Sequence, residues 1–271
     1  MSRITACLNS LSEKGVKALI PYIVAGDPTP QLMVPLMHAL VEKGADILEI
    51  GVPFSDPAAE GPIIQLAHER ALANDTGMRT ILQMVKTFRE QDVNTPIVLM
   101  GYANPIEYIG YTAFADAASK AGVDGILTVD IPPEEANGLD TELKRVGIDN
   151  IFLISPTTSE ERIGHIIAAA RGFLYYVSLK GVTGAGHLDI NSVAKKLSYI
   201  KSLSALPVAV GFGINDAASA SAIAEVADAV VVGSALVDRI YQHSELVDDH
   251  QQLLNKATQI IADMRQAMDA A

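Results

Sequence analysis

The chain has 271 residues, of which 49% are hydrophobic and only 5% aromatic, so its core must be built mainly from aliphatic side chains. Its formal net charge of −12 argues against a nucleic-acid or anionic-membrane surface, because either needs a basic patch. The single cysteine, Cys7, excludes an intrachain disulfide and favours the cytoplasm, and we expect neither a signal peptide nor a membrane span of about 18 apolar residues.

Eight short apolar segments rich in β-branched residues recur along the chain. They occupy residues 18–26, 45–52, 95–102, 124–131, 150–156, 172–178, 206–213 and 228–235. Each lies near Gly, Pro or Asp, as strands usually do. Because the segments are continuously apolar rather than alternating, they are predicted to be strands covered on at least one face by helices.

Segments with helical periodicity lie between these strands. We expect helices over residues 30–44, 112–122, 159–172, 215–228, 237–246 and 248–268. Gly122 is a typical C-terminal cap and Ser159 a typical N-terminal cap. Pro35 would cost roughly 3 kcal/mol inside a helix, so we expect a late start or a kink in the first of these segments.

Strands that alternate with helices over most of the chain predict a (β/α)₈ TIM barrel, here with an extra N-terminal helix. The rival fold is an open doubly wound sheet, which should show a GxGxxG sequence after the first strand. Residues 23–30, IVAGDPTP, do not supply one. Without a linker or low-complexity segment, residues 1–271 are predicted to form one domain.

Acidic side chains gather where such a barrel carries its chemistry, at the C-terminal ends of strands and in the loops that follow. Glu49 lies within an aliphatic segment. If it faces the barrel mouth, poor solvation would raise its pKa and make it a proton donor near neutral pH. The alternative is a structural carboxylate that binds a backbone N–H or an arginine.

Three further acids follow strands in the sequence. Glu60 stands in a Gly/Pro-rich loop and would complete an acid/base pair with Glu49, although a lone acid in such a loop is more often a surface residue. Asp27 is interpreted as a turn or cap residue, and Asp130 either as a cap or as a site residue.

Glycine-rich loops follow the last three predicted strands, at residues 178–186, 210–215 and 231–235. Each alone could be a tight turn. Together, at consecutive positions around the barrel mouth, they favour a phosphate site in which glycine lets the backbone approach the anion and Ser234 adds a hydroxyl.

Other catalytic arrangements have little support. The six histidines are scattered without HxH or HExxH spacing, so no metal site is expected, and no GxSxG motif is present. Lys180 could form a Schiff base at a strand end, but in a glycine-rich loop a solvated or phosphate-facing lysine is commoner.

The motifs from about Pro21 to Leu236 resemble the α subunit of tryptophan synthase. They are PYIVAGDP, LEIGVPFSDP, EGP, IQ, YANP, GVDGILTVDIPPEE, SLKGVTGAG, GFGI and GSA. The string from Glu49 to Gln65 is highly specific for this family. The glycine-rich phosphate-binding loops alone would be shared with many barrels.

The resemblance implies a lyase that cleaves indole-3-glycerol phosphate by retro-aldol chemistry to indole and glyceraldehyde 3-phosphate, as part of tryptophan biosynthesis. It also implies an α₂β₂ complex with a β subunit that receives the indole. In the family the pyridoxal phosphate belongs to that subunit, so no cofactor is expected here.

The resemblance also assigns residues. Glu49 matches the acid/base residue, and Glu60 matches the carboxylate that accepts a hydrogen bond from the indole N–H. The remaining matches are the substrate-binding Tyr22, Tyr102, Tyr175 and Thr183, the phosphate-binding Gly184, Phe212, Gly213, Gly233 and Ser234, and Asp56 at the surface that touches the β subunit.

One departure from the family pattern concerns Glu60, where Asp is usual. The extra methylene moves the carboxylate by roughly 1.5 Å on a fixed backbone, and a shift of about 1 Å can cost on the order of 10²-fold in rate. Either the loop compensates, or Glu60 plays a weaker part, or activity is low.

Three rival functions follow from the same residues. They are a Schiff-base aldolase that uses Lys180, another phosphate-binding barrel such as a phosphoribosyl isomerase, and a non-catalytic subunit that binds phosphate and activates a β-type partner. The Glu49–Gln65 string counts against the isomerase.

Overall fold

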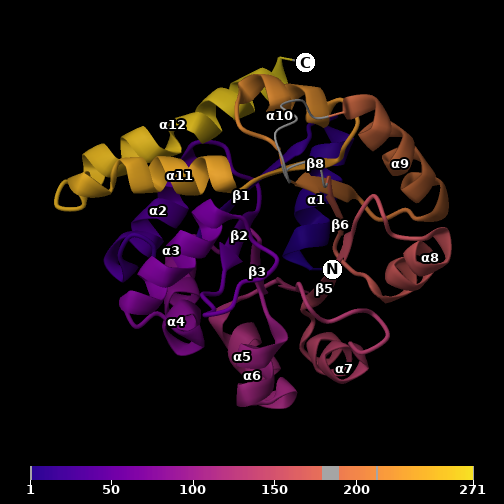
Figure 1. Ribbon diagram of the computed structural model, residues 1–271, viewed down its shortest axis with the longest axis horizontal. Coiled ribbons are helices and arrows are strands. Elements are labelled where there is room, and N and C mark those ends of the chain that lie inside the picture. The colour runs from indigo at the N-terminus through magenta and orange to yellow at the C-terminus, as the bar shows by residue number, and fades with distance from the viewer. Residues whose placement is uncertain (1, 179–188, 212, 271) are drawn as a thin grey trace.

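The strands of this protein form a closed parallel barrel in the order β1 to β8 (Figure 1). The computed structural model describes residues 2–178, 189–211 and 213–270. The strands are β1 Ala18–Val24, β2 Leu48–Gly51, β3 Ile97–Gly101, β4 Gly125–Thr128, β5 Asp149–Ile154, β6 Leu174–Val177, β7 Val208–Gly211 and β8 Ala229–Val232. Ala18 pairs with Ala229, which closes the ring. The predicted TIM barrel is confirmed, and the rival open sheet is wrong.

The helices lie around the barrel as an outer layer, except the first, which lies across one end of it (Figure 1). They are α1 Arg3–Glu13, α2 Pro30–Glu42, α3 Pro62–Ala73, α4 Met78–Arg89, α5 Ala103–Ile109, α6 Tyr111–Ala121, α7 Asn137–Val146, α8 Glu160–Ala169, α9 Ile190–Leu203, α10 Ala217–Ala224, α11 Ser234–Gln242 and α12 His250–Asp269, with a short 3₁₀ turn over Ser244–Leu246. The prediction that all of residues 1–271 form one domain stays a prediction.

Two of the predicted helix ends are confirmed. Of the late start or kink expected in the first predicted helix, the late start is wrong and the kink stays a prediction. Gly122 ends α6 in the left-handed conformation, with φ of 94°, and the Ser159 hydroxyl accepts the Arg162 N–H at the start of α8. Helix α2 does not start late: Pro30 takes its first turn, where a missing N–H costs nothing, and Pro35 lies inside. The buried face of α2, which includes Leu36 and Leu40, stabilises the helix despite this proline.

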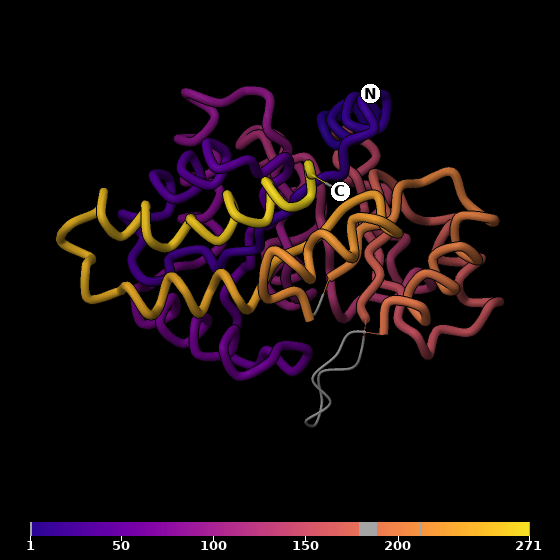
Figure 2. The backbone as a smooth tube through the Cα atoms, turned by 90° about the horizontal axis from the view of Figure 1, so that it is seen from above, coloured from indigo at the N-terminus to yellow at the C-terminus, as the bar shows by residue number. Residues whose placement is uncertain are grey.

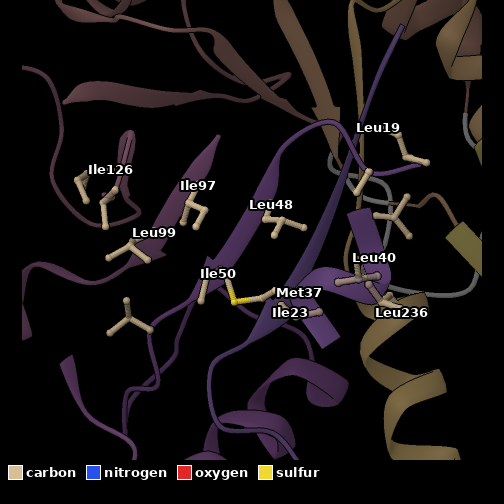
Figure 3. Packing of buried hydrophobic residues seen from close by; sticks show 14 of the residues in the cluster. Leu19, Ile23, Met37, Leu40, Leu48, Ile50, Ile97, Leu99, Ile126 and Leu236 are labelled. Atoms are coloured by element: carbon tan, nitrogen blue, oxygen red, sulfur yellow. The ribbon is translucent and has the colours of Figure 1, made fainter. Parts of the chain in front are cut away.

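Strand residues alternate between two apolar layers. Figure 3 shows outward-facing side chains of neighbouring strands, among them Leu48 and Ile50, on the side of Met37 and Leu40 of α2. The inward-facing residues form a second cluster inside the barrel. This alternation decides which strand residues can reach a site at the barrel mouth.

Helix α1 covers the N-terminal end of the barrel, at one extreme of the molecule in Figure 2. Its Ile4 and Leu8 are buried against the inner cluster, and its N-terminal Arg3 pairs with Asp124 at 2.8 Å. The predicted extra helix is therefore present, and the opposite end of the barrel is left for a ligand. Within the described residues, no helix is both long and apolar enough to cross a membrane.

Candidate active site

A cavity of about 370 Å³ opens among the C-terminal ends of the strands. Its wall is mainly apolar, and its polar groups come from two strand tyrosines, from loops and from a helix start. The lining residues are Tyr22, Ala59, Glu60, Gly61, Ile64, Met100, Val129, Leu153, Ser155, Tyr175, Val177, Gly213, Ile214, Asn215, Val231, Gly233 and Ser234. Such a space suits a flat apolar group held by a few polar contacts.

Glu49 points into the barrel. It lies two residues beyond Ile47 of the inner cluster, and its register partners on the neighbouring strands are Tyr22 and Val98. The side chain is 1% exposed, and within the described part of the chain neither carboxyl oxygen has a hydrogen-bond partner. Burial raises the pKa of Glu49 to about 8. The carboxyl is therefore protonated at neutral pH and holds a proton that it can give.

Glu49 does not line the cavity but lies behind the cavity wall, to which Tyr22 and Tyr175 contribute. A β-carbon on Gly51, two residues above Glu49 on the same inner face, would lie only 2.7 Å from Tyr22 Cζ and closer still to its oxygen. The Tyr22 ring therefore crosses from β1 onto β2, and Tyr175 approaches Gly211 on β7 in the same way. These rings keep water away from the Glu49 carboxyl.

Glu60 lines the cavity from the loop after β2, and Tyr102 fixes it from behind. The Tyr102 hydroxyl donates to Glu60 Oε2 and accepts the Ala59 N–H at 3.0 Å, while Phe54 stacks on its ring at 4.9 Å. Burial raises the pKa of Glu60, and the Tyr102 hydrogen bond opposes that rise. Tyr102 itself does not line the cavity, so it reaches a ligand only through Glu60.

Another part of the cavity lining has the features of an anion site. Gly213, Gly233 and Ser234 line it, and Gly233 is the N-cap of α11. The first N–H groups of a helix have no partner within the helix and carry a partial positive charge, so they favour a negatively charged ligand. The predicted Thr183, Gly184 and Phe212 lie outside the described residues, as does Lys180.

Three other acids singled out in the sequence lie away from the cavity lining. Asp27 does not cap α2, whose N-cap is Thr29; its buried carboxylate accepts two hydrogen bonds from Arg70, at 2.7 and 2.9 Å. Asp130 accepts the N–H of Ala103 at the start of α5, which fits the cap interpretation. Asp56 is exposed on the loop after β2.

A buried histidine in the site was not predicted from the sequence. His68 on α3 is 1% exposed, and its Nε2 lies 3.4 Å from the Tyr22 oxygen. Ser155 and Asn215 of the cavity wall were missed as well. No spacing in the sequence indicates these contacts, since each depends on how separate elements pack. Among the described residues, no three His, Cys, Asp or Glu side chains gather in a way that could hold a metal ion.

A family model described as tryptophan synthase alpha chain matches residues 8–269 of this chain. The chain belongs to the tryptophan synthase alpha chain family. It is 57% identical over 269 residues to the tryptophan synthase alpha chain of Thioalkalivibrio sulfidiphilus, with 99% of this chain and all of the relative covered. It is 55% identical over 270 residues to that of Ralstonia nicotianae, with both chains fully covered.

Solved structures agree with this assignment to the tryptophan synthase alpha chain family. Tryptophan synthase subunit alpha from Legionella pneumophila superimposes with a TM-score of 0.92 at 46% identity over the whole of both chains. A chain of tryptophan synthase from M. tuberculosis in its aminoacrylate-bound form gives 0.86 at 32% identity, over 99% of this chain and all of that one. The resemblance seen in the motifs is confirmed, and the phosphoribosyl isomerase alternative is wrong.

Proposed function

We propose that this chain catalyses the alpha reaction of tryptophan synthase, the retro-aldol cleavage of indole-3-glycerol phosphate to indole and glyceraldehyde 3-phosphate. The observation that carries the proposal is the inward-facing carboxyl of Glu49, buried beneath an apolar cavity and without a partner among the described residues. A buried, neutral carboxylic acid is a suitable general acid at neutral pH.

The cavity explains how the substrate would be oriented. Its apolar wall, which includes Met100, Val129 and Leu153, suits the indole ring. The phosphate would bind across the cavity at Gly213, Gly233 and Ser234, where backbone N–H groups are available. The scissile bond then lies between these two subsites, above the rings of Tyr22 and Tyr175.

The reaction would proceed in two proton transfers at Glu49. Its side chain extends between the two tyrosine rings and donates its proton to the indole carbon that carries the glycerol chain, which places positive charge on the indole nitrogen. The resulting carboxylate takes the proton of the adjacent glycerol hydroxyl. The carbon–carbon bond then breaks, and its electron pair neutralises the indole as the aldehyde forms.

Glu60 would stabilise the cationic intermediate by accepting a hydrogen bond from the indole N–H. Its position on the cavity wall, supported by Tyr102 and by Gln65, whose Nε2 donates to the Glu60 carbonyl at 2.9 Å, suits this part. Within the same proposal, Thr183 bonds the carboxylate of Glu60 and Gly184 and Phe212 join the phosphate site, although all three lie outside the described residues.

The proposal includes a β subunit that receives the indole, in an α₂β₂ complex. In this proposal Asp56 and the exposed part of the loop after β2, the same loop that carries Glu60, contact the β subunit. We also propose a cytoplasmic location and no cofactor bound to this chain. None of these proposals depends on Lys180, which a Schiff-base mechanism would require.

The test is the release of glyceraldehyde 3-phosphate and indole from indole-3-glycerol phosphate by Glu49→Gln, with and without a β subunit. We expect kcat to fall by about 10²- to 10⁴-fold, the usual contribution of a general acid, with KM little changed. Glu69→Gln, an exposed acid on α3, is the matched control and should keep the wild-type rate.

Two results would contradict the proposal. One is a Glu49→Gln variant with the wild-type rate, which would remove Glu49 from the chemistry. The other is a wild-type chain that releases no product under either condition, which would favour the non-catalytic regulatory subunit.

A further inference from the structure

The hydrogen bonds of His68 fix which of its ring nitrogens carries hydrogen. Nδ1 lies 3.1 Å from the backbone nitrogen of Phe54, which can only donate, so Nδ1 is the acceptor. Burial lowers the pKa of His68 to about 4, so the ring is neutral at pH 7. Its one hydrogen is therefore on Nε2, which faces the Tyr22 oxygen at 3.4 Å.

This tautomer determines what Tyr22 can do. Since Nε2–H is the donor, the Tyr22 oxygen accepts from His68 and its own hydrogen remains available. Among the described residues, Tyr22 makes no other side-chain hydrogen bond. The phenol is thus held on one side and is able to donate on the other.

The position of the Tyr22 hydroxyl shows where that hydrogen can be used. The hydroxyl occupies the space over Gly51, two residues beyond Glu49 on the inner face of β2. A Glu49 side chain that extends toward the cavity along the inner face of β2 comes close to this hydroxyl, because Gly51 is the next residue on that face. After Glu49 gives up its proton, a buried carboxylate without a donor would be strongly unfavourable.

We propose that His68 is a positioning residue, which orients the Tyr22 phenol so that its O–H donates a hydrogen bond to the ionised Glu49 carboxylate formed during the reaction. The inference rests on the proposed function, since it assumes that Glu49 is the acid. In this inference Tyr22 is a hydrogen-bond donor as well as an aromatic wall residue, and α3 contributes to the reaction through His68.

Other titratable groups face the same space and must be kept constant. They are Glu60 in the loop after β2, Tyr102 after β3 and Tyr175 on β6, of which Glu60 and Tyr175 line the cavity. None of them is changed in the experiment below, so a change in the pH profile can be assigned to Tyr22 and His68.

The test is a double-mutant cycle on kcat with Tyr22→Phe and His68→Asn. Phenylalanine keeps the ring and removes the O–H, while asparagine keeps an acceptor for the Phe54 N–H and loses the donor to Tyr22. We expect Tyr22→Phe to lower kcat by about 10- to 100-fold, as for a hydrogen bond to a charged group, with KM within about threefold. His68→Asn should lower kcat less, and the double variant should match Tyr22→Phe within about twofold, because both changes remove one interaction.

The pH profile separates positioning from loosened packing. Removing the donor disfavours ionised Glu49, so the alkaline limb of kcat should move to higher pH in Tyr22→Phe and in His68→Asn. A variant that only loosens the packing would admit water, stabilise the carboxylate and move the limb to lower pH.

Controls cover folding and the underlying function. His38→Asn, at a histidine of α2 that stacks on Phe88 outside the site, should keep the wild-type kcat. If His68→Asn does not fold, His68→Gln is measured instead. Its amide keeps a donor near the Nε2 position, so its kcat and alkaline limb should stay close to wild type, and a loss as large as that of Tyr22→Phe would overturn the role of His68.

The outcomes distinguish this inference from the proposed function. Additive losses in the cycle, a wild-type kcat in Tyr22→Phe, or an alkaline limb that moves to lower pH would each overturn the role of His68, provided that Glu49→Gln is inactive. A fully active Glu49→Gln would instead overturn the proposed function itself.

Discussion

The two carboxyl groups at the cavity, those of Glu49 and Glu60, lie in different environments. Glu49 lies below the cavity in apolar surroundings, with no partner among the described residues, and burial raises its pKa to about 8. Glu60 lines the cavity; burial raises its pKa too, but the Tyr102 O–H that it accepts opposes the rise and favours its ionised form. The environments thus suit Glu49 to give a proton and Glu60 to bind a positively charged intermediate.

The role of Glu60 can be tested by removing its charge. In Glu60→Gln the side chain keeps its length and an acceptor oxygen but no longer attracts the cationic indole. We expect kcat to fall by about 10- to 100-fold, the range for a hydrogen bond to a charged group. Steady-state kinetics of indole release measures this, and a Glu60→Gln variant within about twofold of wild type would assign Glu60 a weaker part.

At the scale of elements, the site depends on how neighbouring strands share the barrel interior. Tyr22 of β1 uses the space that Gly51 of β2 leaves free, and Tyr175 of β6 uses the space at Gly211 of β7. A side chain at either glycine would displace a phenol from the cavity wall. The tyrosine rings therefore need glycine at these two positions, and they in turn shield the Glu49 carboxyl from water.

Gly51→Ala should lower both stability and activity. The added methyl group would clash with the Tyr22 ring, and overpacking of this kind costs about 1 to 3 kcal/mol. Thermal or urea unfolding measures the stability, and indole release measures the activity. In the matched control Gly164→Ala, in α8, the new β-carbon meets nothing within 4 Å, and helix propensity predicts a gain of about 0.5 to 1 kcal/mol. A Gly51→Ala variant as stable and active as wild type would contradict the ring placement.

At the scale of the whole molecule, the sequence predicts the barrel and part of the site. The barrel is predicted by apolar strands that alternate with helices. Glu49 is predicted as a candidate proton donor because it is an acid within an aliphatic strand. The glycine-rich loops indicate an anion site at Gly233 and Ser234, because glycine just before the start of a helix lets an anion reach the free backbone N–H groups. These features are local, so a pattern of neighbouring residues is enough to find them.

Contacts between separate elements could not be predicted in this way. The His68–Tyr22 contact depends on how α3 packs on β1, and α3 buries only Ala67, His68 and Ala71, which is too little for a clear apolar stripe. The paired hydrogen bonds of Arg70 to Asp27 join α3 to the loop after β1. By contrast, the buried residues of α4 recur at helical spacing, a local pattern in the sequence, although no helix was predicted there.

The proposed chemistry depends most on the protonation state of Glu49 at neutral pH. The direct measurement is a ¹³C NMR titration of chain labelled at the glutamate carboxyl carbons, in which the Glu49 signal is assigned by its absence from Glu49→Gln. We predict a protonated carboxyl at pH 7 that ionises with a midpoint of about 8. A signal that is already ionised at pH 7, with a midpoint near the ordinary glutamate value of 4.5, would contradict the account.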